Sequence, residues 1–227
     1  MKKHFGLFLL QLLFIVPFAF AQNFEGSIEY SLSVDGEGEN IQQTKDAMPN
    51  KMTYFIKDDN MKIRTEGGMA AAMAGDIIMV GKERTMYILQ PASKMAMQIK
   101  MEDTEDEEVK PVVTKMDETE NIAGYDCQKY KVVSKTEQGD VVSYLWVTDK
   151  LKVDVPQSMM QSGTQMNLPG EIDGFPLKVI SHIDMAGNQL TMIFTASEVN
   201  KTSLNASDFK IPEDYTKQVV SPDMLGR

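Results

Sequence analysis

The chain has 227 residues, with 33 Asp and Glu against 23 Lys and Arg, which gives a formal net charge of −10 at pH 7. This acidic balance disfavours nucleic acids and anionic membrane surfaces as partners, because both attract basic patches. A single Cys excludes a disulfide within the chain, and the length is sufficient for one substantial hydrophobic core. We therefore expect packing to supply the stability.

The first residues predict export. The stretch MKKHFGLFLLQLLFIVPFAFAQ combines two lysines, an apolar run and Ala19-Phe20-Ala21, which is typical of a signal peptide cleaved after residue 21. A membrane anchor is the alternative, but a run interrupted by Gln11 and Pro17 is short for a hydrocarbon core of about 30 Å. Residue 22 is Gln rather than the Cys that begins a lipoprotein. We expect a signal peptide at residues 1–21 and an exported protein, periplasmic or secreted, with no lipid anchor and no integral membrane segment after cleavage.

The mature chain opens on its clearest strand pattern. In FEGSIEYSLSV, apolar and polar side chains alternate with a period of two, which predicts a half-buried strand. A loop containing Gly and Gln is predicted next. KMTYFIK and MKIRT then flank the turn residues 58–60 and predict a hairpin, and residues 76–101 predict three further strands separated by turns. Between them, EGGMAAAMAGD predicts one or two helical turns or a loop. Consecutive strands of this kind form an antiparallel meander.

An acidic segment at residues 102–110 separates this group of strands from a second one. Its carboxylates could bind Ca²⁺, but the segment lacks the Gly or Asn that would curl it around an ion, so a solvated loop is favoured. Beyond it, strands are predicted in VVTKMDET, YDCQKYKVV, VVSYLWVT, LKVISHID and LTMIFTASEV, a short helix after Pro156, and a polar tail from about residue 216. The sequence thus predicts a mainly β, single antiparallel domain over residues 22–227 with short helical segments.

The mature chain offers little for catalysis. Its one histidine, His182, lies inside LKVISHID, where a surface or hydrogen-bonded strand residue is the simpler interpretation. No nucleophile elbow, paired His or Cys motif, P-loop or Gly-rich dinucleotide motif occurs. We predict no catalytic residue, no metal site and no cofactor, and an enzyme is the least expected class.

Methionine is the unusual feature of the composition, with 18 residues. Three interpretations stay open, namely Met as an adaptable core filler, Met lining a cavity for a flexible apolar ligand, and Met as a Cu(I) ligand in MAM or SMMQSGTQM. The tracts around Met69 and Met159 interrupt the strands with short apolar pieces, as either a lid or ordinary loops would. The candidates for an apolar ligand site or its lid are Met69, Met73, Met95, Met97, Trp146, Met159 and Met160.

The single thiol, Cys127, lies in NIAGYDCQKYKVV at the start of a predicted strand. Lys129 and Lys131 nearby would lower the pKa of the thiol and make it reactive, but no resolving Cys or general base accompanies it. We expect Cys127 to be a small packed residue and a structural landmark.

Six short motifs follow one another along the chain: FEGSIEY, YFIKDDNMKIRTE, ENIAGYDCQKYKV, YLWVTDKL, GFPLKV and SDFKIPEDY. Over most of residues 24–215 they resemble a family of exported bacterial proteins described as domain of unknown function 4412. That family is similar to the LolA- and LolB-like lipoprotein carriers. The resemblance implies a curved antiparallel half-barrel with short helical segments over an apolar concave face. The missing lipidated Cys sets this chain apart from a membrane-anchored acceptor.

Together, the residues and the resemblance predict a periplasmic, carrier-like binding protein that shelters a lipid or other apolar ligand in a concave β-sheet. The alternative is a non-enzymatic structural or interaction module of the cell envelope, with a closed core and an envelope protein as its partner. Binding of Cu(I) by Met is a third hypothesis. A concave face that is open and apolar would favour the first hypothesis.

Overall fold

The computed structural model describes residues 23–37, 41–73, 75–101, 110–136, 139–155, 168–185 and 188–220. Within these residues the helical segments are α1 (Ile41–Ala47), α2 (Gly68–Met73), η1 (Gly81–Glu83) and η2 (Ala206–Phe209). The strands are β1 (Gly26–Glu37), β2 (Lys51–Lys57), β3 (Asn60–Glu66), β4 (Ile77–Val80), β5 (Thr85–Gln90), β6 (Met95–Lys100), β7 (Val112–Ile122), β8 (Tyr125–Thr136), β9 (Gly139–Thr148), β10 (Phe175–Met185), β11 (Asn188–Lys201) and β12 (Thr216–Val219).

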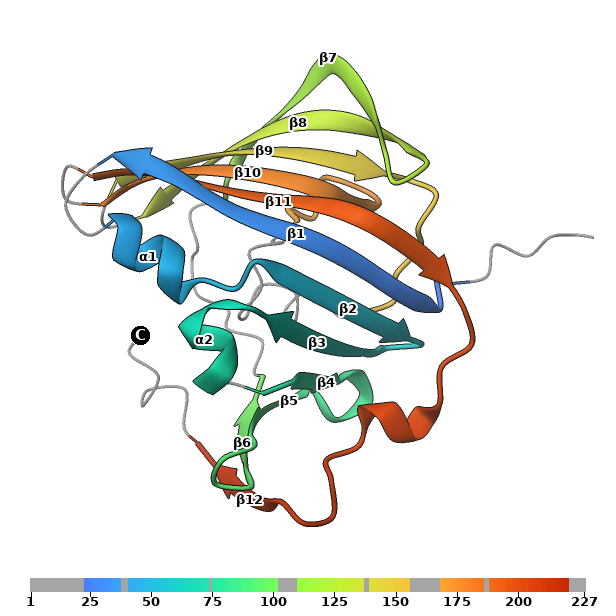
Figure 1. Ribbon diagram of the computed structural model, residues 1–227. Helices are drawn as coiled ribbons and strands as arrows, with labels where there is room; N and C mark the ends of the chain where they lie inside the picture. Colours follow the sequence, from blue (N-terminus) through green and yellow to red (C-terminus); the bar gives the residue numbers. More distant parts are fainter. Residues whose placement is uncertain are drawn as a thin grey trace, which may run out of the picture.

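These strands form one curved sheet that does not close into a ring (Figure 1). Its order is β12-β6-β5-β4-β3-β2-β1-β11-β10-β9-β8-β7, so β1 joins the two sequential groups of strands by pairing with both β2 and β11. The described pairings are antiparallel except that of β12 with β6, which is parallel. The structure therefore confirms a mainly β, curved and mostly antiparallel sheet with few helices.

The register gives the sheet two faces, and we call the buried face around which the sheet curves the inner face. On this face Leu32, Phe194, Val179 and Leu145 lie opposite one another on β1, β11, β10 and β9, and all four are buried. At the next position the outer face carries Ser33, Ile193, Ile180 and Tyr144. The main hydrophobic cluster lies on the inner face because the alternation of each strand puts its larger apolar side chains there.

A smaller hydrophobic cluster covers the outer face of β4 to β6. Ile78, Tyr87, Leu89 and Ala96 pack there against Phe209 of η2. These strands are apolar on both faces because the segment after β11, which contains η2, packs over their outer face. The same chain then continues into β12, at the start of the segment that the sequence predicted to be a polar tail, and all four β12 side chains are exposed.

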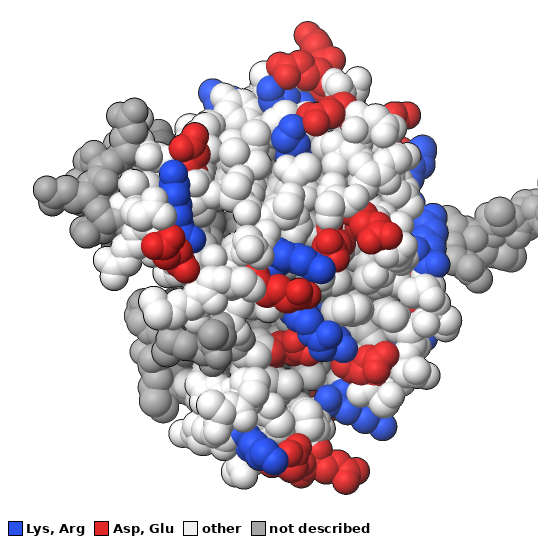
Figure 2. Space-filling model, in the orientation of Figure 1, with Lys and Arg blue, Asp and Glu red and all other residues white. Residues whose placement is uncertain are grey.

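Elsewhere the outer face carries ion pairs. Lys51 pairs with Glu29 at 2.7 Å across β2 and β1, and Arg64 on β3 makes a two-pronged contact with Asp76, at 2.8 and 2.9 Å. Figure 2 shows Lys and Arg side chains next to Asp and Glu side chains over this part of the molecule. Such exposed pairs contribute little stability each, so the fold depends on the inner-face packing.

Helices α1 and α2 lie next to each other where β1 and β3 end (Figure 1). The sequence predicted a loop where α1 is found, because this short helix buries no residue and has a weak apolar pattern. α2 agrees with the predicted helical turns. Gly68 has φ +67, and a Cβ there would lie 2.2 Å from the carbonyl oxygen of Met48, so only Gly allows this close approach. The helix predicted after Pro156 falls outside the described residues.

Candidate functional site

A groove lies on the inner face of β8, β9 and β10. Its volume is about 180 Å³, below the roughly 300–1,000 Å³ of drug-sized ligand pockets, so it fits a short apolar group. It is lined mainly by aliphatic side chains, with three serines among them and two prolines at its border: Val132, Val141, Leu145, Val179, Ile183, Ser134, Ser143, Ser181, Pro111 and Pro169. We call it the inner groove.

Strand alternation builds the inner groove. Val141, Ser143 and Leu145 share one face of β9, whereas Val142, Tyr144 and Trp146 share the other. Ser143 lies opposite Val132 of β8 and opposite Ser181 of β10. The Oγ atoms of the two serines are 2.9 Å apart and form a hydrogen bond. The groove thus combines an apolar lining with one polar pair, which is the usual composition of a small-ligand site.

The inner face beside the groove is filled rather than open. Large, fully buried side chains occupy it on β1 to β4, including Tyr30, Tyr54, Ile56, Met61 and Met79. The segments that follow β9 and precede β10 also enter the main cluster, through Leu151 and Ile172. The inner groove lies apart from these packed regions, on the part of the inner face that β8 to β10 line.

Two tyrosines in this packed region differ in their hydrogen bonding. Tyr30 and Tyr54 meet edge to face, with ring centroids 5.4 Å apart. The Tyr30 hydroxyl donates to the carbonyl oxygen of Pro176 at 2.7 Å, whereas the Tyr54 hydroxyl has no partner within the described residues. Burial raises the pKa of both hydroxyls, that of Tyr30 well above its ordinary value. Both tyrosines therefore stay protonated at physiological pH.

The topology gathers methionines from separate strands onto the inner face. Met61, Met79 and Met86 lie opposite one another on β3, β4 and β5, and all three are buried in the main cluster. Met95 and Met97 share the same face on β6 and are half-buried. The three buried methionines act as core packing, whereas Met95 and Met97 remain candidates for lining an apolar surface.

The other predicted candidates that the structure describes lie apart from the inner groove. Met69 on α2 is 60 % exposed, and Met73 ends the same helix. Met159 and Met160 fall outside the described residues. Met95 and Met97 are on β6, at the other end of the strand order from the groove. The structure does not bring the described candidates Met69, Met73, Met95 and Met97 together with β8 to β10.

Trp146 lies on the outer face. It stands opposite Lys129 and Lys178, whose Nζ atoms are 5.0 and 4.5 Å from its ring centroid. Lys129 forms an ion pair with Glu118 at 2.6 Å, and Lys178 forms one with Glu120 at 2.9 Å. Trp146 is only 7 % exposed. Lysine stems cover its ring on the outer face, and it also belongs to the main hydrophobic cluster, but it does not line the inner groove.

Sequence reasoning missed Ser143 and Ser181. A signal was present, because each serine occupies the strand parity of its aliphatic neighbours, in VVSYL and in VISHI. A polar residue at an inward position is the informative exception in such a pattern.

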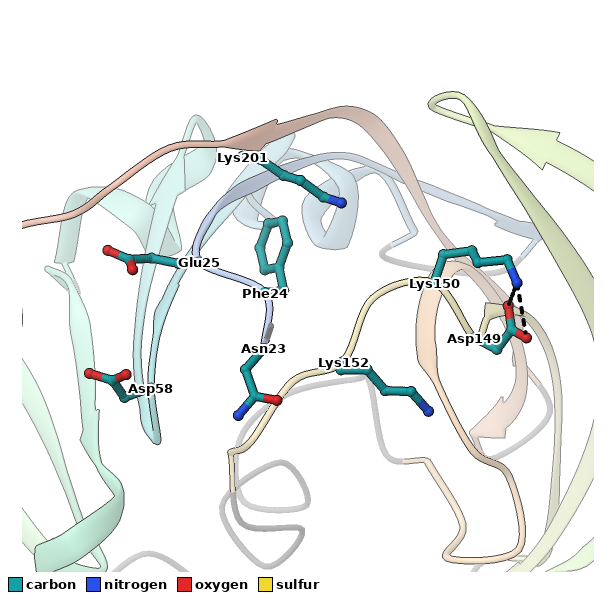
Figure 3. Close-up of a pocket in the computed structure, with 8 residues that line it drawn as sticks. All are labelled: Asn23, Phe24, Glu25, Asp58, Asp149, Lys150, Lys152 and Lys201. Atoms are coloured by element: carbon teal, nitrogen blue, oxygen red, sulfur yellow. Dashed lines mark hydrogen bonds and ion pairs between the residues drawn. The ribbon is translucent and has the colours of Figure 1, made fainter. Parts of the chain in front are cut away.

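A second opening lies at the start of β1 and is polar (Figure 3). It has a volume of about 780 Å³ and is lined by Asn23, Phe24, Glu25, Asp58, Asp149, Lys150, Lys152 and Lys201. Figure 3 shows Lys152 and Lys201 extending to one side of Phe24, and Glu25 and Asp58 pointing to the other. Most of these charges are compensated, for example Lys150 by Asp149 at 3.1 Å and Lys152 by Asp173 at 3.1 Å. Because its lining is mostly charged and polar, this opening gives an apolar ligand little apolar surface to bind.

Cys127 is 1 % exposed, and its Sγ donates to the carbonyl oxygen of Tyr125 at 3.4 Å. Burial, assisted by the charges of Glu120 and Asp126, raises the pKa of the thiol to about 11. At pH 8 only about one native molecule in a thousand then carries the thiolate. We expect a maleimide to label Cys127 at least about 100-fold more slowly in native protein than in urea. Rapid native labelling through the neighbouring opening of about 260 Å³ would contradict this.

The raised pKa of Cys127 also predicts a pH dependence of stability. In the unfolded chain the thiol has a pKa of about 8.5, so between this value and about 11 the unfolded state binds fewer protons than the folded state. The free energy of unfolding should therefore fall as the pH rises through this window. Urea titrations at pH 8 and pH 10, with Cys127→Ala as the control, measure this contribution.

The fold and the inner groove define a mainly β protein with an open, curved sheet. A family model described as "Domain of unknown function (DUF4412)" matches residues 37–215. The chain therefore belongs to this family, which confirms the resemblance found in its motifs.

Among solved structures, the chain is similar to one described as "Structure of PNGF-II in C2 space group", with 15 % sequence identity and a TM-score of 0.49. The similarity covers 87 % of this chain but only 31 % of that protein, so the chain spans less than a third of its length. A comparison with curated proteins gives no match. No described helix has the length and apolarity needed to cross a membrane. The described residues contain no group of three or more His, Cys, Asp or Glu suited to a metal ion.

Proposed function

We propose that this protein is an exported, non-enzymatic binding protein of the cell envelope that holds the apolar part of a lipid or similar ligand in the inner groove. The observation that carries the proposal is the aliphatic lining of a groove on a buried sheet face. The signal-like residues 1–21 support export to the periplasm, and the lack of catalytic motifs supports a binding role.

The size of the inner groove limits what it binds. Each methylene moved from water into such a groove contributes about 0.8 kcal/mol. With about 180 Å³, the groove takes a short section of an acyl chain rather than a whole lipid. A section of about four methylenes would contribute about 3 kcal/mol, which predicts weak and reversible binding by this groove alone.

The packed region of the inner face favours a second candidate. Because Tyr30, Tyr54, Ile56 and Met61 fill the sheet next to the groove, the protein also fits a closed module of the cell envelope that acts through a protein partner. Cu(I) binding is less favoured, since Met61, Met79 and Met86 are packed in the core. Direct measurement of ligand binding separates the first candidate from the second.

Two neighbouring residues on β9 provide the test. Val141→Phe places a ring in the inner groove, whereas Val142→Phe places the same ring on the outer face, and both positions are half-buried in the native protein. We expect Val141→Phe to weaken binding of an environment-sensitive fluorescent fatty acid at least about tenfold, and Val142→Phe to change it less than about twofold. Fluorescence titration of the mature protein measures both. Native protein that binds no probe, or equal effects of the two substitutions, would disprove the proposal.

A further inference from the structure

The two opposed serines in the inner groove have more hydrogen-bonding capacity than the protein uses. Ser143 and Ser181 lie opposite each other in the register, both line the groove, and Ser181 is only 5 % exposed. Their mutual bond is the only hydrogen bond of either Oγ within the described residues. Two hydroxyls carry two protons, and a mutual hydrogen bond uses one of them. The second proton is therefore left to donate elsewhere.

The side chains next to the pair offer at most one weak acceptor for this proton, the thioether sulfur of Met192. Along β9 the same face carries Val141 and Leu145, and across the sheet Ser143 faces Val132 while Ser181 faces Met192. A buried hydroxyl that donates to nothing costs free energy, so an inward-facing serine pair among aliphatic side chains is unfavourable unless something in the groove accepts from it.

We propose that the serine pair donates its second proton to a carbonyl or carboxyl oxygen of the ligand, which makes the ligand a fatty acid or an acyl ester rather than a plain hydrocarbon. This inference rests on the proposed function, because it assumes that an apolar chain occupies the inner groove. The aliphatic lining then holds the chain next to its oxygen, and the pair fixes the depth at which the head of the ligand sits. A site built around such a donor discriminates against analogues that lack the oxygen more strongly than an apolar wall does.

The test compares two ligands with the same chain, methyl octanoate and octane, by displacement of a fluorescent fatty acid from the mature protein. In the double variant Ser143→Ala with Ser181→Ala, we expect the affinity for methyl octanoate to fall about tenfold, whereas the affinity for octane stays within about twofold. Ser143→Thr keeps the hydroxyl and should retain at least half of the ester affinity. Ser33→Ala, on the outer face of β1, is the matched control and should change neither ligand.

The outcomes separate this inference from the proposed function. In one outcome, octane and methyl octanoate both bind native protein while the double variant lowers their affinities equally or not at all. In that case the serine pair does not bind the ligand oxygen, and the proposed function stands without this inference. If neither ligand displaces the probe from native protein, both proposals fail. Circular dichroism and thermal melting check that each variant is folded, and the single variant Ser143→Ala, expected to show part of the ester-specific loss, replaces the double variant if the latter does not fold.

Discussion

Replacing Phe194 with Ala is expected to lower the free energy of unfolding by about 3–5 kcal/mol. Phe194 is 2 % exposed on the inner face of β11, the strand that joins β1 to β10. It lies opposite Leu32 on one side and Val179 on the other, so its removal leaves a cavity between two rigid, paired strands. Domains of this kind are stable by only about 5–15 kcal/mol, so this single change removes a large share of the total.

The matched control is the preceding residue on the same strand. Ile193 points to the outer face and is half-buried, so Ile193→Ala should cost about 1 kcal/mol. Urea denaturation followed by Trp146 fluorescence and circular dichroism measures both variants. Equal losses would contradict the assignment of inner and outer faces to β11.

The second large effect concerns the tyrosine pair, where the same chemical change should act in opposite directions. Tyr30→Phe removes a hydroxyl that donates to Pro176, leaves that carbonyl oxygen without its partner, and should lower the free energy of unfolding by about 1–3 kcal/mol. Tyr54→Phe removes a buried hydroxyl that has no partner within the described residues. It should therefore leave the stability unchanged or raise it by about 1 kcal/mol.

Each tyrosine serves as the control for the other, because the two rings are in contact and both are fully buried. Thermal melts and urea titrations of the two single variants are sufficient. A clear loss of stability in Tyr54→Phe would show that its hydroxyl has an acceptor, such as a buried water, and would contradict the prediction.

Local patterns predicted the hairpins because their information lies within a few residues. The turn at Asp58 has φ +54, which Asp tolerates better than most residues, and the flanking strands pair over the predicted stretch. The strands of residues 76–101 pair as the predicted meander. α1 was missed because a seven-residue helix without buried side chains is held by its contacts with β1 and α2 rather than by its own sequence.

The candidate site was harder to predict, because alternation states which residues share a face but not which face is inward. Trp146 and Leu145 are adjacent and both apolar, yet one lies under lysines on the outer face and the other lines the inner groove. Ser143 and Ser181 are 38 positions apart, and only the pairing of β9 with β10 brings their hydroxyls together. Side-chain chemistry alone favoured Met and Trp, and did not single out these serines.

By itself, the sequence determined the mainly β class, the principal hairpins and the family, because these depend on period-two alternation, turn residues and motifs that are local in the chain. Only the tertiary structure decided that β1 joins both groups of strands, that three methionines from separate strands share the core, and that the groove lies on β8 to β10. These features depend on pairings between distant residues, such as Gly26 with Lys201, whose free energy comes from burying a shared face. A pattern of neighbouring residues in the sequence does not predict which distant strands bury a face together.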